Sequence, residues 1–441
     1  MITNSLFQAY RTFFGKGDAL YQLFSPYRIC PLGAHVDHQH GLVSGFAFDS
    51  GIDFLFSETE TGKVEMCSLS FEGLMTFNVQ RPVEEKQNNW GDYLRGAVWA
   101  LQQDFQLRKG IRGVVKGSMP IGGLSSSAAL LCGFVMALGK INNLYLDKMQ
   151  VINYASRAER EYVGLNNGIL DQACVVLCES DKLLYLDTRT SEYQLLPFGG
   201  EENHKEIPFE LGIFFSGVTR KLTGTDYNLR VSECKTAAWI MEAYENVPLK
   251  ELQDTRLRDI DEEIFKKYEN KMPERFAKRA RHFYTECDRV EAGVEAWKKG
   301  DIKTFGQLIF ESCESSMNNY ECGSPELIAL YHIMRNTDGI YGGRFSGAGF
   351  KGACIALVDP TKKESIQGYI TKEYLKQFPQ YKDTFEMFFC KPANGVDFMY
   401  HEKYCDCSGV CHSPLPSYAE LSQAFAQGRQ TYYSRQDARR P

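Results

Sequence analysis

Three glycine-containing segments of this chain have the residue types of a phosphoryl-transfer site. They are residues 28–37 (RICPLGAHVD), 120–129 (PIGGLSSSAA) and 342–349 (GGRFSGAG), and they lie far apart in the sequence. In the second segment, serines follow paired glycines and lead directly into the apolar run 128–138. This pattern predicts a loop that opens into a buried helix, whose free backbone N–H groups can hold a phosphate.

Periodicity and end signals indicate a mixed α/β chain that becomes mainly helical beyond about residue 211. Ser324 as N-cap, Pro325 at the first helical position and Glu326 in the first turn give the strongest helix start. The expected strands are 43–57, 183–187 and 353–358, and the expected helices are 147–162, 226–244, 274–299 (closed by Gly300) and 325–334. We expect an N-terminal domain over 1–205, a C-terminal domain over 206–400 and a tail over 401–441.

Composition limits the classes of protein that this chain can be. At 441 residues it is too long for one ordinary core, which favours two domains. Hydrophobic residues at 43% and charged residues at 24% are typical of a soluble globular protein. The 50 basic and 56 acidic residues give a net charge of -6, which does not favour a nucleic-acid partner and leaves an anionic substrate to local positive groups.

Other features argue for a cytoplasmic protein without a membrane partner. The N-terminus lacks a continuous apolar segment of the signal-peptide kind, and no apolar stretch approaches 18 residues. The 14 cysteines follow no repeating framework, and several lie in apolar runs, which is typical of reduced thiols. His401, Cys405, Cys407, Cys411 and His412 could bind zinc, but their spacing matches no usual finger, so a poorly ordered tail with reduced thiols is the better interpretation.

Five motifs in the right order resemble the GHMP kinase superfamily of small-molecule kinases, and within it the galactokinase branch. They are an arginine with a His-x-Asp pair, GLSSSA, GILDQ, TDYNLR and SGAG, and the resemblance covers residues 25–399. It implies two α/β domains with the active site in the cleft between them. It also implies an ATP-dependent sugar kinase that uses Mg²⁺. Oligomeric state stays open, and a monomer is compatible with the sequence.

The resemblance assigns a role to each matched residue. The catalytic pair is Arg28, which would stabilise the transferring phosphoryl group, and Asp171, which would accept the hydroxyl proton. The sugar would be bound by Ala34, His35, Asp37, Gly168 and Tyr227. ATP would be bound by Trp90, Gly122, Gly123, Leu124, Ser125, Ser126, Ser127, Gly347 and Gly349. Mg²⁺ would be held by Ser126 and Glu159.

Several of these residues have a purely structural alternative. Without the resemblance, Asp171 reads as an aspartate at a helix N-terminus that interacts with the dipole. Glu159 reads as part of a solvated helix face, with Arg157 and Arg160 as charge partners. Trp90 is almost as well explained as a core tryptophan. The second motif is one residue shorter than usual between Pro120 and Leu124, which leaves its phosphate contacts open.

The departures from galactokinases point to the substrate. Galactokinases have a glutamate, which contacts the C6 hydroxyl of the sugar, where this chain has Ala34. Alanine removes a negative charge that would repel a C6 carboxylate. The first motif, read from Tyr27 to Gln39, is closer to galacturonokinases, so we expect 1-phosphorylation of D-galacturonate. His38, Arg220 and Lys221 are candidate cations for the carboxylate.

Three alternatives stay open at this point. Ala34 can be a packing substitution without meaning for the substrate. The protein can then be a galactokinase or a kinase of another monosaccharide. It can also be a catalytically silent sugar sensor on the same scaffold, although the presence of both Arg28 and Asp171 argues against that class.

Overall fold

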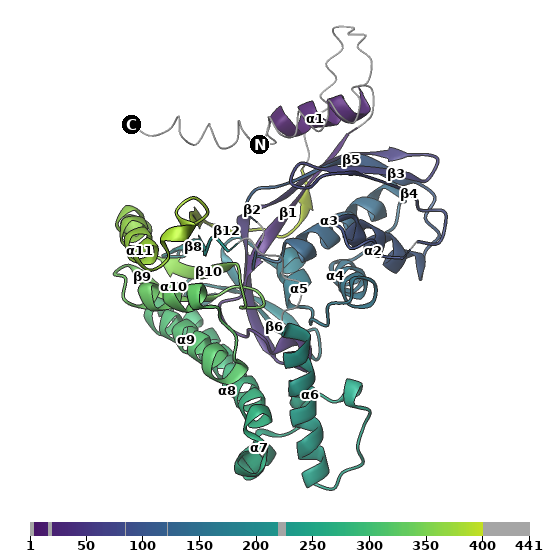
Figure 1. The fold of residues 1–441 in the computed structure, drawn as a ribbon. Coiled ribbons are helices and arrows are strands. Elements are labelled where there is room, and N and C mark those ends of the chain that lie inside the picture. The colour runs from purple at the N-terminus through teal and green to yellow at the C-terminus, as the bar shows by residue number, and fades with distance from the viewer. Residues whose placement is uncertain (1–3, 16–19, 84, 121, 219–225, 400–441) are drawn as a thin grey trace.

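The computed structural model describes residues 4–15, 20–83, 85–120, 122–218 and 226–399. Two β-sheets organise these residues (Figure 1). The expected fold class, a mixture of helices and sheets in a two-domain arrangement, is confirmed. The division at residue 205 stays a prediction. Arg220, Lys221 and the cysteine- and histidine-containing tail lie outside the described residues.

The larger sheet has nine strands, with the order β13-β1-β2-β5-β3-β4 along its main path. β12 and β6 also pair with β2, and β7 pairs with β6. The antiparallel pairing of β1 with β2 places Arg28 opposite Ala47. The strands are β1 (Tyr21–Ile29), β2 (Leu42–Thr59), β3 (Lys63–Ser68), β4 (Leu74–Asn78), β5 (Gly110–Gly117), β6 (Lys182–Asp187), β7 (Tyr193–Pro197), β12 (Pro392–Ala393) and β13 (Asp397–Phe398).

Helices cover both faces of this sheet. Alternation along β2 directs Phe54 and Phe56 into the main core, whereas Leu55 faces the small cluster formed with Leu6 and Tyr10 of α1. Figure 1 shows α2 to α5 gathered on one side of the sheet. The helices are α1 (Asn4–Phe14), α2 (Gly91–Gln102), α3 (Ser126–Ile141), α4 (Lys148–Arg157) and α5 (Leu170–Leu177).

The smaller sheet has four strands in the order β11-β8-β10-β9. Its strands are β8 (Glu210–Phe215), β9 (Ile340–Phe345), β10 (Ala353–Val358) and β11 (Glu386–Cys390). The helices of this half are α6 (Tyr227–Tyr244), α7 (Glu262–Tyr268), α8 (Glu274–Lys298), α9 (Ile302–Ser315), α10 (Pro325–Arg335) and α11 (Lys363–Gln377). A π-helical turn, η6 (Ser316–Tyr320), follows α9 directly.

Most expected elements form where the sequence signals place them. Strand 353–358 is β10, and the helix predicted at 325–334 is α10, whose Ser324 hydroxyl accepts the N–H of Leu327 at 3.4 Å. The helix predicted at 147–162 differs, because α4 ends at Arg157 and continues as the π-helical turn η2 (Ala158–Val163). Gly164, at φ 91°, closes this wider turn by donating to Glu159 O, and the turn carries Glu159.

Two further expectations concern the thiols and the membrane. The eleven cysteines within the described residues are free thiols, and most of them are buried. Within the same residues, no helix combines the length and the apolar character that crossing a bilayer requires.

Candidate active site

Arg28 and Asp171 lie in direct contact, although 143 positions separate them in the sequence. Arg28 stands near the end of β1 and Asp171 in the first turn of α5, and Arg28 Nε donates to Asp171 Oδ1 at 2.7 Å. Burial opposes the charged form of Arg28, but the Asp171 carboxylate outweighs it and raises the pKa of the guanidinium. The structure therefore brings together the two residues that the resemblance assigns as the catalytic pair. Asp171 is both a helix N-terminal residue and the partner of a buried cation.

Ser125 joins this pair to the second motif. Its hydroxyl contacts Oδ2, the second oxygen of the Asp171 carboxylate. Ser125 is the residue before α3 and has a left-handed backbone (φ 53°), and its side chain makes no capping bond to the helix. The first-turn N–H groups of α3 are therefore not capped by Ser125. This agrees with the predicted loop and helix start that can hold an anion.

The second and third motifs pack against each other through their glycines. Ser346 Oγ donates to Gly123 O at 2.5 Å, and Arg28 Nη1 donates to the same carbonyl at 3.2 Å. A Cβ atom on Gly347 would lie 2.9 Å from Gly123 Cα, and one on Gly122 would lie 3.0 Å from Gly352 Cα. Side chains at these positions would separate the two loops, so glycine is required for their contact.

The residues expected to bind the sugar surround Asp37, which the 3₁₀ turn η1 (Asp37–Gln39) carries. A Cβ atom on Gly168 would lie 2.4 Å from Asp37 Oδ2, so only glycine allows α5 to begin this close to the carboxylate. Asp37 accepts the N–H of His38 at 3.0 Å and that of Leu170 at 3.4 Å. The ring of Tyr227, at the start of α6, lies 6.1 Å from that of His38.

Burial dominates the electrostatics of this group. It raises the pKa of Asp37 to about 6, together with the nearby charge of Asp171. It lowers the pKa of His35 well below its ordinary value, with His282 adding to the effect. It also lowers the pKa of His38 to about 3, together with Arg256. The lowered pKa favours a neutral His38 in the absence of a bound anion, and its role as the cation for a C6 carboxylate stays a prediction.

Ala34 and His35 come from the loop after β1 and face the second half of the chain. Ala34 is buried; Glu286 holds its N–H and a ring nitrogen of His282 lies 3.0 Å from its carbonyl oxygen. The ring of His35 stacks on that of Tyr320 with 4.2 Å between centroids. A Cβ atom on Gly349 would lie 3.6 Å from His35 Nε2, so the third motif also reaches this loop.

Glu159 lies buried beside the catalytic pair, not on a solvated helix face. Its Oε2 accepts the side-chain amides of Asn167 at 2.8 Å and Gln172 at 2.6 Å. Burial raises its pKa, and a hydrogen bond from Ser127 opposes that shift. The serine that contacts Glu159 in this structure is thus Ser127, the neighbour of the predicted Ser126. The interpretation of Glu159 as a solvated residue is wrong.

Trp90 precedes α2 and belongs to the main core, with 7% of its surface exposed. Its Nε1–H is buried, and no residue in the described part of the chain accepts a hydrogen bond from it. The structure therefore agrees with a core tryptophan, and its contact with adenine stays a prediction.

The sequence did not predict several side chains that lie beside these motifs but come from distant parts of the chain. A cavity of about 310 Å³ is bordered by Asp37 and Gly168, and also by Arg160 and Arg256. Cys322 Sγ lies 3.7 Å from His35 Nε2. No local pattern marks Arg256 or Cys322, because their relevance comes only from the packing of segments distant in sequence.

Comparisons with known proteins agree with this geometry. Residues 92–179 match the GHMP kinases N terminal domain, and residues 294–377 match the GHMP kinases C terminal family. The chain is 39% identical over 377 residues to the galacturonokinase of Arabidopsis thaliana, which covers 81% of this chain and 87% of that protein. It is 33% identical to the galactokinase of Thermococcus kodakarensis, which covers 85% of this chain and 99% of the relative.

A solved structure shows the same fold. Lactococcus lactis galactokinase complexed with galactose superposes with a TM-score of 0.80 at 26% identity and covers 88% of this chain and 98% of the galactokinase. Both matched domains and these relatives belong to one family. The chain belongs to the GHMP kinases, in their galactokinase branch.

Proposed function

We propose that this protein transfers the γ-phosphoryl group of ATP to the anomeric hydroxyl of a monosaccharide, and that D-galacturonate is its preferred substrate. The observation that carries the proposal is the contact between Arg28 and Asp171 beside the loops of the second and third motifs. It places a carboxylate and a guanidinium at one point, next to a helix start that suits phosphate.

Each member of the pair has a distinct part in the reaction. Asp171 accepts the proton of the anomeric hydroxyl, whose oxygen forms the new bond to phosphorus while the bond to ADP breaks. In the structure, the Ser125 hydroxyl contacts Oδ2 of Asp171, and the hydroxyl of the sugar would take its place there. Arg28 remains charged and is aimed at the same point, where it stabilises negative charge on the transferring group.

The residues around Glu159 fit a bound Mg²⁺ ion. Asn167 Oδ1 and Gln172 Oε1 are buried acceptors that have no hydrogen-bond partner among the described residues, and both side-chain amides donate to the Glu159 carboxylate. Oxygen-rich surroundings of this kind suit Mg²⁺. Ser126 and Glu159 would hold the ion, which would neutralise charge on the phosphates of ATP. Burial disfavours the charged form of Glu159 and raises its pKa. A cation beside the carboxylate would stabilise the charged form and offset this effect.

Galacturonate is favoured over galactose for two reasons. The relative from Arabidopsis thaliana is a galacturonokinase, and Ala34 leaves the sugar pocket without the acidic side chain that galactokinases carry there. A C6 carboxylate then meets no like charge from position 34. Arg160 and Arg256 border the cavity beside Asp37 and supply positive charge in the neighbourhood.

ADP release tests the proposal most directly. Purified protein with Mg-ATP is assayed with galacturonate, galactose, glucuronate and arabinose. We expect release with galacturonate well above that with galactose. A preference for galactose would remove the uronate assignment and leave a sugar kinase. No turnover with any of the four sugars, together with measurable sugar binding, would favour the catalytically silent sensor.

A further inference from the structure

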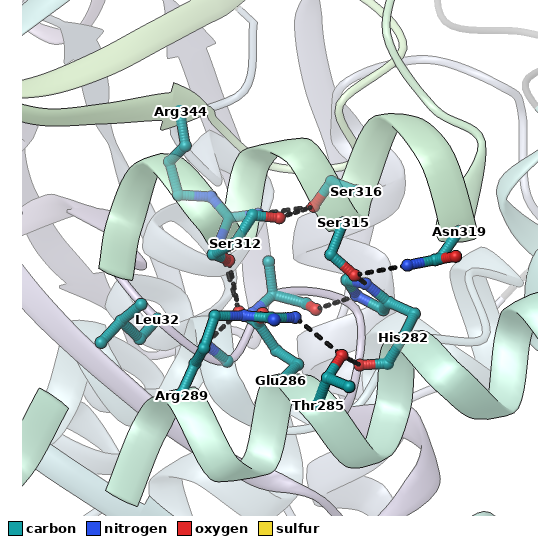
Figure 2. Close-up of polar contacts among 12 residues, drawn as sticks. Leu32, His282, Thr285, Glu286, Arg289, Ser312, Ser315, Ser316, Asn319 and Arg344 are labelled. Carbon is teal, nitrogen blue, oxygen red and sulfur yellow. Dashed lines mark hydrogen bonds and ion pairs between the residues drawn. The ribbon is translucent and has the colours of Figure 1, made fainter. Parts of the chain in front are cut away.

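A buried ionic cluster supports the loop that carries Ala34 and His35. Its centre is Glu286 of α8 and Arg344 of β9, whose side chains are 0% and 1% exposed. Figure 2 shows both side chains pointing into the space between α8 and the C-terminal end of α9 with the turn that follows it, with their partners around them. Glu286 lies outside the motifs from which the reaction was argued, whereas Arg344 lies in the third segment, two residues before its SGAG sequence.

The Glu286 carboxylate accepts hydrogen bonds from the main chain of the first motif. Its Oε1 accepts the N–H of Gly33 at 2.8 Å and that of Ala34 at 3.3 Å. Ser312 Oγ donates to the same oxygen at 2.5 Å, and Arg289 Nε donates to Oε2 at 2.8 Å. Burial opposes ionisation of this carboxyl, but Arg289 and Arg344 outweigh it and lower its pKa to about 2. The carboxylate is therefore charged at neutral pH.

Arg344 extends the cluster to the first and third motifs. Its Nη1 donates to Pro31 O at 3.4 Å, and its Nη2 donates to Ser316 Oγ at 3.1 Å. It stands two residues before Ser346, whose hydroxyl holds Gly123 O in the second motif. The cluster therefore lies between the loop expected to bind the sugar and the loops expected to bind ATP.

The loop itself cannot supply these contacts. Gly33 has φ 95°, and a Cβ atom there would lie 2.5 Å from Val43 Cα, so the chain turns sharply against β2 at this point. The N–H groups of Gly33 and Ala34 then point at a side chain of α8, more than 250 residues away in the sequence. Without such an acceptor these buried N–H groups would be left without a hydrogen bond, which destabilises this conformation of the loop.

We propose that Glu286 is a positioning residue for the sugar pocket. By fixing the main chain at Gly33 and Ala34, it sets where Ala34 and His35 meet the sugar, and it does so without touching the reacting atoms. The inference rests on the proposed sugar kinase activity but not on which sugar is preferred. It is tested with whichever sugar the wild-type protein phosphorylates best, so a wrong substrate assignment and a wrong role for Glu286 give different results.

The test compares the KM values for sugar and for ATP in two variants. Glu286→Gln keeps the shape but removes the charge, and Glu286→Asp keeps the charge but withdraws it by one methylene, about 1.5 Å. We expect either variant to raise the KM for the sugar at least 10-fold and to leave the KM for ATP within twofold. Glu286→Asp keeps an anion beside Arg344 and Arg289, so it remains measurable if Glu286→Gln fails to fold.

Trp297→Phe is the matched control on the same helix. Trp297 is fully buried in α8, and its Nε1–H donates to Leu196 O at 2.8 Å, away from the first motif. We expect this variant to lower Tm and to leave both KM values unchanged. Equal changes in the two KM values of Glu286→Asp, or a lower Tm with an unchanged KM for the sugar, would overturn the positioning role and leave Glu286 as an ordinary buried ion pair.

Discussion

The two oxygens of the Asp171 carboxylate each have a donor, Arg28 on one side and Ser125 on the other. Asp171→Asn keeps this shape but can no longer accept a proton. We expect kcat to fall at least ~10³-fold, since general base catalysis and the charge beside Arg28 are lost together. The measurements are ADP release and Tm, with Asp147→Asn at the exposed cap of α4 as the control. Activity above a tenth of the wild-type value would remove Asp171 from the mechanism.

Position 34 tests the choice of substrate. Two like charges about 8 Å apart repel by about 2 kcal/mol at an effective dielectric of about 20, which corresponds to a roughly 30-fold change in preference. We therefore expect Ala34→Glu to lower kcat/KM for galacturonate ~30-fold more than for galactose. Ala34→Gln has the same size without the charge and separates crowding from repulsion. Equal losses for both sugars in Ala34→Glu would make Ala34 a packing residue.

Asp37 predicts a pH dependence of stability. Its folded-state pKa is about 6 against an ordinary value of 3.8, because burial disfavours the anion. A raised pKa means that the folded state holds the proton more tightly, so stability is lost as pH rises from about 4 to about 6. The loss amounts to up to about 3 kcal/mol.

The measurement is the Tm of Asp37→Asn and of the wild-type protein across this range. Asparagine does not titrate, so the variant should gain stability over the wild type as pH rises and keep that gain above pH 7. Its KM for the sugar should rise, because the anionic acceptor is gone. A constant difference in Tm between pH 4 and pH 7 would mean that Asp37 titrates normally.

At the scale of elements, the sequence predicted helix starts correctly where capping residues and apolar runs determine them. Ser324 and Pro325 marked the start of α10, and the apolar run after Ser127 marked α3. The motif matches assigned Arg28 and Asp171 to one catalytic pair, and the two side chains are in contact in the structure. The π-helical turn at Ala158–Val163 was not predicted, because a single wider turn is too short to establish a spacing of its own that differs visibly from that of the helix before it. The acceptor for the N–H groups of Gly33 and Ala34 was not predicted either. Glu286 lies on α8, and the local sequence of a helix does not indicate which distant loop will pack against it.

The contact between the second and third motifs gives a prediction at this scale. Gly347 has φ 66°, and a Cβ there would press on Gly123 Cα at 2.9 Å. Gly347→Ala should therefore lower stability by about 1–2 kcal/mol from the left-handed backbone alone. It should also raise the KM for ATP several-fold, because the loop around Gly123 must shift.

Gly368→Ala is the control for Gly347→Ala, because we expect it to raise stability and not to lower it. Gly368 lies within α11, and no atom of the described ranges lies within 4 Å of where its Cβ would stand. Alanine at this exposed helical position should raise stability by about 0.5–1 kcal/mol without a kinetic effect. Both variants are compared by Tm and by the KM for ATP. An unchanged KM for ATP in Gly347→Ala would separate the third motif from nucleotide binding.

At the scale of the whole molecule, the chain returns to its first sheet at the end of the described residues. β12 pairs with β2 and β13 pairs with β1, so residues 392–398 extend the sheet that carries Arg28. Between them, Gly395 N donates to Cys178 O at 2.8 Å and Val396 N to Val175 O at 2.7 Å, which attaches the segment to the end of α5. The helix that carries Asp171 in its first turn is thus held at its far end by residues more than 200 positions later.

Two truncations distinguish this segment from the tail beyond it. A chain that ends at Met399 keeps β12, β13 and the bonds to α5, and all the described site residues precede its end. We expect its kcat and both KM values to stay within twofold of the full-length values. A chain that ends at Lys391 loses the two strands and those backbone bonds, so its Tm should fall by several degrees and its kcat should fall with the loosening of α5. The comparison also tests zinc binding by the cysteine- and histidine-containing tail, because a metal site needed for activity would make the chain ending at Met399 as inactive as the shorter one.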